Sequence, residues 1–289
     1  AASDVYKRQN TVKAALNLVV KYGLSQRELG GVLAIGIDEI SRKRGHRYMT
    51  NVYDLERMRL IWTGEGREEK TLERFFTEMG EEFTRGLKGI CCDMWSPYLK
   101  VIQEKAPQAL LVFDKFHLIR HLLEAVDQVR REEARELEKE HPDLLKGTRY
   151  LFLKNPWNLT ENQRIKLKEL EKLNLRVNRA YLLKEAFRRF WDYTYPGNAR
   201  KYLQAWLFWA SHSRLKPLVE FAQMLRRHET GILNWFKLGI NNGMVEALNR
   251  KAKVIAARAY GYRTPHTFAL AMYHCLGNLP MPNLTHKFL

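Results

Sequence analysis

The sequence predicts an α/β fold, with a mixed sheet of three antiparallel strands plus two parallel ones and a large all-α insertion before the last helix. Three β-rich segments follow one another between residues 31 and 63, which is typical of an antiparallel meander. Two short apolar strands then flank a helix, and such strands indicate a parallel crossover that is buried on both faces. Residues 118–235 show no strand pattern and are expected to form the insertion.

The first part of the chain contains the predicted meander. Residues 10–30 carry apolar side chains at helical spacing, and we expect a helix there. The three strands are expected in the apolar run that ends at Asp38, in Tyr48–Asp54 and in Arg59–Thr63. Residues 1–9 fit no pattern and resemble translated read-through of a sequencing adapter. We therefore give them no role and expect an N-terminally truncated chain.

Helices and strands alternate after the meander. Apolar residues at helical spacing predict a helix at Glu69–Thr84. We then expect a buried strand at Leu87–Cys92, a helix at Ser96–Ala106 that Pro107 ends, and an all-apolar strand at Ala109–Phe113. The predicted order is β-β-β-α-β-α-β, in which the last two strands run parallel because a helix connects them.

The remaining sequence is expected to be helical. Charged helices are predicted at Arg120–Glu140 and Thr160–Tyr195, and the aromatic residues within 187–195 are expected to pack this block. A last helix is predicted from Asn241 to about Ala259, with Asn as a suitable N-cap.

The last predicted helix has two distinct faces. Its buried stripe is expected to consist of Val245, Leu248, Ala252, Ile255 and Ala259. Spacings of three, four and seven residues place four polar side chains together on a different face, namely Glu246, Asn249, Arg250 and Lys253.

The composition indicates a nucleic-acid partner and excludes several classes of protein. Against 32 acidic residues the chain has 49 Lys and Arg, a net charge of +17, and nucleic acid is the commonest polyanionic partner of such a protein. The hydrophobic fraction of 45% excludes global disorder, and no apolar run reaches the ~18–20 residues of a membrane span. The three cysteines form neither a disulfide framework nor a metal knuckle, which favours a reducing compartment.

Carboxylates follow the predicted strands. Asp38, Asp93 and Asp114 each end a strand, and Glu246 lies on the last helix. A basic protein that acts on a phosphodiester must hold divalent cations against a polyanion, and carboxylates supply the oxygen ligands for a pair of cations about 3.5–4 Å apart. The pattern predicts a site for Mg²⁺ or Mn²⁺. The alternative is that each Asp merely ends its strand or caps the next helix.

Four segments resemble the motifs of a known family, the ISL-three insertion-sequence transposases. They are Gly36–Glu39, Asp93–Tyr98, Asp114–His117 and Asn242–Lys253, followed by the tripeptide 261–263, and the resemblance extends over about residues 30–275. It implies a DDE active site on an RNase H-like fold, with a helical insertion before the last catalytic helix. This family usually also has an N-terminal zinc-binding segment and a helix-turn-helix, and the sequence contains no such cysteine cluster.

The resemblance implies roles for the acidic residues. Asp38 is expected to be the first catalytic acid and metal ligand, and Glu246 the last. The topology of RNase H-like proteins selects Asp93 as the middle acid, and Asp114 is the alternative. His117 is expected to be auxiliary, either as a DNA contact or as a residue that caps a helix.

The reaction implied by the resemblance is metal-dependent cleavage at insertion-sequence ends followed by strand transfer into target DNA. Four residues are expected at the DNA, namely Asn249, Arg250, Lys253 and Arg263. The expected partners are transposon-end and target DNA and further copies of the chain in a synaptic complex, without a membrane, in a bacterial or archaeal cytoplasm at the nucleoid. The alternatives are an RNase H-like nuclease or resolvase without strand transfer, a non-catalytic relic, and a covalent mechanism through Tyr98 or Tyr262.

The same reasoning divides the chain into six parts. The expected parts are the read-through residues 1–9, a helical remnant of a DNA-binding region at 10–30, the first part of the catalytic core at 31–117, the insertion at 118–235, the last catalytic helix and end of the core at 236–275, and a tail at 276–289.

Overall fold

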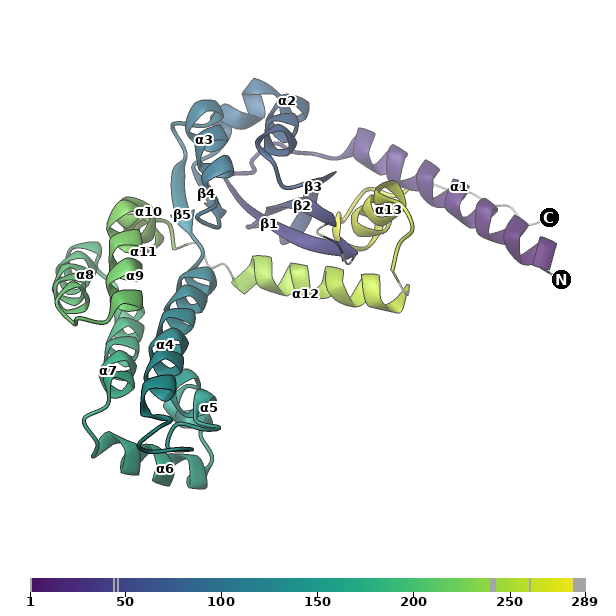
Figure 1. The fold of residues 1–289 in the computed structure, drawn as a ribbon. Helices are drawn as coiled ribbons and strands as arrows, with labels where there is room; N and C mark the ends of the chain where they lie inside the picture. The colour runs from purple at the N-terminus through teal and green to yellow at the C-terminus, as the bar shows by residue number, and fades with distance from the viewer. Residues whose placement is uncertain (1, 44, 46, 240–242, 260, 283–289) are drawn as a thin grey trace, which may run out of the picture. The chain divides into compact units, whose positions relative to one another are not determined.

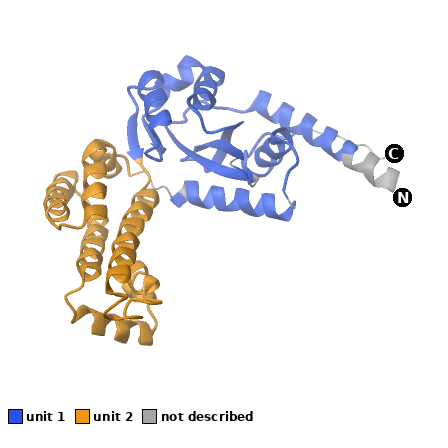
Figure 2. Ribbon diagram, viewed as in Figure 1, with its two compact units in different colours: residues 1–112, 240–289 blue, residues 113–239 orange. Residues whose placement is uncertain are grey.

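The computed structural model describes residues 2–43, 45, 47–239, 243–259 and 261–282 (Figure 1). The chain forms two compact units, one made of Ala1–Val112 with Ile240–Leu289 and the other of Phe113–Gly239 (Figure 2). The first unit contains the sheet, and the second contains helices. The two units are described separately below.

A five-stranded mixed sheet, in the order β3-β2-β1-β4-β5, forms the centre of the first unit. Its strands are β1 (Ala34–Lys43), β2 (Arg47–Asp54), β3 (Arg59–Glu65), β4 (Gly89–Cys92) and β5 (Leu110–Phe113). The pairs β1–β2 and β2–β3 are antiparallel, whereas β1 and β4 are parallel. The predicted mixed α/β sheet is therefore confirmed.

Helices cover both faces of this sheet (Figure 1). On one face, α2 (Glu69–Gly86) and α3 (Ser96–Lys105) pack on the strands through an apolar cluster that includes Ile35, Ile37 and Phe75. On the other face, α12 (Gly243–Arg258) contacts β1, and α13 (Pro265–Leu276) contacts β3. Neighbouring residues of β1 therefore face different helices, because side chains alternate along a strand.

The first strand is longer than the sequence predicted. The apolar run was expected to end at Asp38, but β1 continues to Lys43. Its pairing with β4 ends at Gly36, whereas its pairing with β2 extends past Asp38 through Ser41. Asp38 therefore lies within the antiparallel hairpin, at the point where the parallel neighbour stops.

Two predicted helices also differ in extent. The first helix, α1, runs over Ala2–Gln26 and so begins before the predicted residue 10. The helix predicted over Thr160–Tyr195 is divided into α6 (Glu161–Glu171), α7 (Arg176–Arg189) and a short 3₁₀ turn. The predicted start of the last helix, at Asn241, lies outside the described residues.

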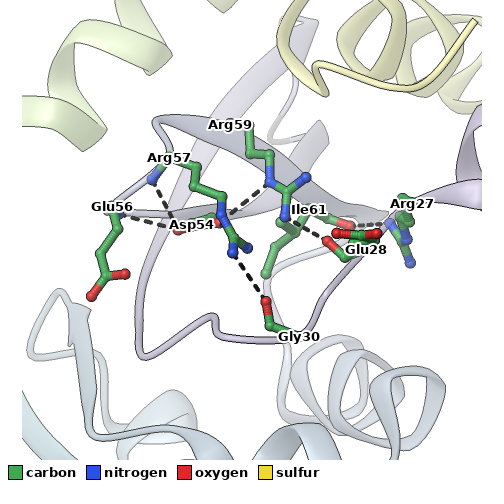
Figure 3. Close-up of polar contacts among 8 residues, drawn as sticks. All are labelled: Arg27, Glu28, Gly30, Asp54, Glu56, Arg57, Arg59 and Ile61. Carbon is green, nitrogen blue, oxygen red and sulfur yellow. Dashed lines mark hydrogen bonds and ion pairs between the residues drawn. The ribbon is translucent and has the colours of Figure 1, made fainter.

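A buried aspartate fixes the turn between β2 and β3 and ties it to the segment after α1 (Figure 3). Asp54 is fully buried, and its Oδ2 lies 3.3 Å from Nε of Arg59 and 3.7 Å from Nη1 of Arg57. Arg59 also donates to the carbonyl of Glu28 at 2.7 Å, and Arg57 to that of Gly30 at 3.1 Å. One carboxylate thus joins two segments of the sheet unit through two arginines.

The second unit is built from helices throughout its described residues. They are α4 (Lys115–Leu137), α5 (Arg149–Leu153), α6, α7, α8 (Pro196–Ser211), α9 (Lys216–Arg227), α10 (Glu229–Leu233) and α11 (Trp235–Leu238), with two 3₁₀ turns. Phe187, Phe190 and Trp191 are buried and lie against Trp206 and other rings, as expected of an aromatic core. Tyr195 does not join this core, because its side chain is 72% exposed.

Among the residues that the structure describes, no helix is both long enough and apolar enough to cross a lipid bilayer.

Candidate active site

Two of the predicted acids belong to neighbouring parts of the sheet, since Asp38 lies in β1 and Asp93 directly follows β4. The parallel register of β1 and β4 sets Gly36 opposite Cys91. Asp38 and Asp93 each follow this last pair by two residues, and Asp93 is the first residue after β4. Both are half-buried. Because side chains two residues apart share a face of the sheet, Asp38 lies on the face of Gly36.

A missing side chain at Gly36 lets α12 approach this face of β1. A methyl group added at Gly36 would collide with Val245 on α12 and would lie 2.8 Å from Leu55. Val245, Leu248 and Ala252 are buried, as the sequence predicted, whereas Ile255 is only half-buried and Ala259, after the end of α12, is exposed. The helix that carries Glu246 is therefore seated directly over the strand that carries Asp38.

Asn249 links this helix to Asp38. Its side-chain amide donates a hydrogen bond to Oδ2 of Asp38, and the backbone N–H of Glu39 donates to Oδ1 at 2.7 Å. Asn249 is only 4% exposed, so it does not lie at the surface where the sequence placed it among the DNA contacts. The reason is its position on α12, four residues after Val245 and three before Ala252, which puts it at the edge of the buried stripe.

A chain of buried polar groups continues from Asn249 into the sheet. Tyr53 donates to Oδ1 of Asn249 at 2.5 Å, and Asn51 donates to the hydroxyl of Tyr53 at 3.0 Å. Thr63 in turn donates to Asn51 at 2.7 Å. All four hydrogen bonds therefore run in one direction and end on the carboxylate of Asp38, an arrangement in which each bond polarises the next.

Burial keeps the phenol of Tyr53 in its protonated, donating form. Desolvation raises the pKa of Tyr53 far above its usual 10.0, the hydrogen bond from Asn51 opposes this shift, and the negative charge of Asp38 adds to it. Since the phenol remains a donor, the amide oxygen of Asn249 must accept from it. The amide nitrogen of Asn249 is thereby directed toward Asp38.

Glu246 lies in the first turn of α12 and is exposed. Its Oε1 is 2.9 Å from Nη2 of Arg250, one turn further along the helix, and the Arg250 side chain is 75% exposed. Lys253 and Arg263 are exposed as well. Among the described residues there is no group of three or more His, Cys, Asp or Glu side chains that could hold a metal ion. Glu246 is thus near Asp38 by its helix, without a formed three-carboxylate cluster.

Asp114 and His117 belong to the helical unit. The Asp114 carboxylate caps α4, since it accepts a hydrogen bond from the backbone N–H of Phe116 at 2.7 Å. Nδ1 of His117 lies 3.0 Å from the same carboxylate. This is the capping arrangement that the sequence offered as an alternative to a catalytic role.

Comparisons with known proteins identify the family of this chain. Residues 35–272 match the family model described as "Transposase", that of the DDE transposases of the ISL-three type. The chain belongs to this transposase family. It is 33% identical over 267 residues to the transposase for insertion sequence element IS1001 of Bordetella parapertussis, an alignment that covers 90% of this chain and 65% of that protein.

A second relative gives the same result. Over 270 residues this chain is 34% identical to the transposase for insertion sequence element IS1557 of Mycobacterium tuberculosis. The alignment covers 85% of this chain and 61% of that relative. The chain thus spans less than two thirds of the length of the curated relatives it matches.

The two tyrosines that a covalent mechanism would need, Tyr98 and Tyr262, have other roles in the structure of this chain. Tyr98 is 1% exposed, and its hydroxyl lies 2.8 Å from that of Thr50. Burial, followed by the nearby charge of Glu39, raises the pKa of Tyr98, so this phenol remains protonated. Glu39 therefore faces α3, on the opposite side of β1 from Asp38. Tyr262 contributes its backbone carbonyl, which accepts from buried Arg42 at 2.9 Å.

Sequence reasoning missed Asn51, Tyr53 and Thr63. Asn51 and Tyr53 are two residues apart on β2, and the register pairs Asn51 with Asp38. Polar groups at alternating positions of a strand, opposite a candidate catalytic acid, are the signal that could have identified them.

Proposed function

We propose that this transposase cleaves DNA at insertion-sequence ends in a reaction that depends on a divalent metal, and then joins the resulting 3′ hydroxyl to target DNA. One observation carries the proposal: the strand that bears Asp38 pairs in parallel with β4, which ends directly before Asp93, and it is contacted by the helix that bears Glu246. The chain spans only part of the length of its relatives, so the activity is proposed for this chain on its own residues.

In this proposal Asp38, Asp93 and Glu246 hold Mg²⁺ or Mn²⁺. Their carboxylates are the hard oxygen donors that these ions prefer, and the half-buried positions of the two aspartates fit such a role. Divalent cations held by these residues would supply Lewis-acid activation of the attacking oxygen and charge stabilisation of the leaving one. Asn249 contributes by fixing one oxygen of Asp38, so the carboxylate needs little reorganisation.

Exposed cations around α12 are proposed to hold the DNA backbone. Lys253 and Arg258 lie on α12, and Arg263 lies on the following loop. Arg42 supports that loop, since it donates to the carbonyls of residues 262 and 263 at 2.9 and 3.3 Å. Lys and Arg that neutralise phosphates supply most sequence-independent affinity for DNA, which matches a net charge of +17.

Two DNA ends and one target have to meet in this reaction. Self-association of the chain in a synaptic complex is therefore part of the proposal.

A joining assay tests the proposed function. The chain is incubated with a pre-cleaved terminal-repeat duplex, a target plasmid and Mn²⁺, and joined product is measured. We expect joining by the wild type and none by Asp38→Asn or Glu246→Gln, with DNA binding retained. Asp143→Asn is the matched control, because Asp143 is exposed and pairs only with surface Lys146 among the ion pairs described.

Hydrolysis of the DNA without joined product would instead favour a nuclease of the same fold. Full activity in Asp38→Asn would overturn the assignment of the acids.

A further inference from the structure

A cavity of about 580 Å³ opens within the sheet unit, and Trp95, at the start of α3, forms part of its lining. Its volume is in the range of small-molecule sites, about 300–1,000 Å³. The residues that matter here come from β2, the start of α2 and the segments before α2 and α3, namely Tyr48, Arg67, Glu68, Glu69, Lys70 and Trp95.

Two aromatic rings in this cavity are held in place by one arginine. The guanidinium carbon of Arg67 lies 4.4 Å from the ring centre of Tyr48 and 5.3 Å from that of Trp95. The indole N–H of Trp95 donates to the backbone carbonyl of Arg67 at 3.2 Å. Trp95 nevertheless remains 42% exposed, so a fixed indole is open to the solvent instead of contributing to the core.

The polar groups of the cavity include both donors and acceptors. Arg67 and Lys70 supply cationic donors, whereas Glu68 and Glu69 supply acceptors. Glu69 is paired with Lys100 at 3.0 Å. Two carboxylates disfavour a site for phosphate alone. The edge of a nucleobase presents both amino donors and ring acceptors, and its flat face stacks on aromatic side chains.

We propose that this cavity binds one unpaired nucleobase of the DNA, with Trp95 as the stacking surface and Arg67 and Glu68 at the base edge. The inference rests on the proposed function for its choice of DNA as the ligand. Trp95 directly precedes α3 and follows Asp93 by two residues, so in this proposal the base belongs to DNA that is held near Asp93. A base bound in the cavity would keep its nucleotide unpaired near the proposed active site.

Binding measurements without divalent metal separate this proposal from the chemistry. The 289-residue chain is titrated into a labelled single strand of about 20 nucleotides and into the corresponding blunt duplex, and anisotropy gives both affinities. Because one stacked base is worth about 1–3 kcal/mol, a factor of about 5 to 150, Trp95→Ala should weaken single-strand binding by that factor. Duplex binding should change less than about twofold, since its bases are already stacked.

A second readout reports on the base itself. A 2-aminopurine in the single strand should lose fluorescence when the wild type binds, should keep it with Trp95→Ala, and should lose it again with Trp95→Phe. Trp157→Ala is the matched control, because Trp157 is 63% exposed and lies 4.2 Å from the guanidinium carbon of Arg188 in the helical unit. It should change neither readout.

Two results would overturn the proposal: unchanged single-strand affinity in Trp95→Ala, or equal weakening on both DNAs. If either occurs while the wild type still joins DNA ends, the proposed function stands and only the base site is wrong. If the wild type binds neither DNA, both proposals fall.

Discussion

Asn249 on α12 donates a hydrogen bond to the carboxylate of Asp38 on β1, a residue 211 positions earlier in the chain. Its orientation is set by Tyr53, which donates to the other end of the same amide. The contact thereby joins the strand that carries the first proposed acid to the helix that carries the last one. The geometry of the site consequently depends on buried groups that touch neither DNA nor metal.

Replacement of Asn249 tests this dependence. Asn249→Ala removes the donor to Asp38, and loss of such a supporting contact typically lowers metal affinity or activity about 10- to 100-fold. We expect the joining rate and the Mn²⁺ titration to shift by that amount while affinity for DNA stays within about twofold. Asn178→Ala is the matched control, because Asn178 bonds only backbone carbonyls of the helical unit among the contacts described. Unchanged joining in Asn249→Ala would remove this residue from the account.

The phenol of Tyr53 makes alkaline stability a second test. Its pKa is raised by burial, so the unfolded chain releases this proton near pH 10 while the folded chain retains it. The stabilisation is therefore complete below about pH 10 and is lost as the pH rises further, by up to about 1.4 kcal/mol per pH unit. Denaturant titrations from pH 9 to 11.5 should show a smaller decline in Tyr53→Phe than in the wild type. Parallel declines would contradict the buried, protonated phenol.

Gly36 should tolerate no side chain. Its added methyl group would collide with Val245, and overpacking of this kind destabilises by about 1–3 kcal/mol. Because the strain separates α12 from β1, Gly36→Ala should lower the joining rate at temperatures where the chain remains folded. Gly197→Ala is the control, since a methyl group there meets nothing within 4 Å. Thermal unfolding and joining rates at 25 °C distinguish the two variants. A Gly36→Ala variant as stable and active as Gly197→Ala would exclude the close approach.

Asp54 should be important for stability and not for chemistry. Asp54→Asn leaves Arg59, whose side chain is only 11% exposed, without its carboxylate partner. Loss of one partner of a buried ion pair destabilises by about 3 kcal/mol. Urea unfolding should show this decrease, whereas Asp143→Asn, at an exposed pair, should change the free energy of unfolding by less than about 0.5 kcal/mol. A decrease as small as that of the control would contradict the role of the Asp54 network (Figure 3).

Much of the fold could be predicted because local patterns determine it. The alternation in Tyr48–Asp54 and the apolar run at Ala109–Phe113 correspond to β2 and β5 within one or two residues. The length of β1 was predicted less well, since Asp38 reads as a strand end in the sequence. Its continuation depends on pairing with β2, which is a tertiary effect.

The candidate site was predicted only in part. Strand ends indicated Asp38 and Asp93, and the register agrees with their being neighbours. Helical spacing grouped Asn249 with Glu246 on the polar face of α12. The same spacing also places Asn249 next to buried Val245 and Ala252, and in the structure Asn249 is buried with them. The chain of hydrogen bonds through Tyr53 joins residues from two strands and a helix, and no local pattern specifies such a pairing.

Asp93 is proposed as the catalytic acid that acts with Asp38, whereas Asp114 caps α4. This assignment is tested most directly by the rate at which a pre-cleaved end is joined to target DNA in Mn²⁺. Asp93→Asn should abolish joining without loss of DNA binding. Asp114→Asn should retain joining and keep its stability within about 0.5 kcal/mol, because Asn caps a helix about as well as Asp. Full joining by Asp93→Asn together with none by a folded Asp114→Asn would show that Asp114, and not Asp93, is the middle catalytic acid.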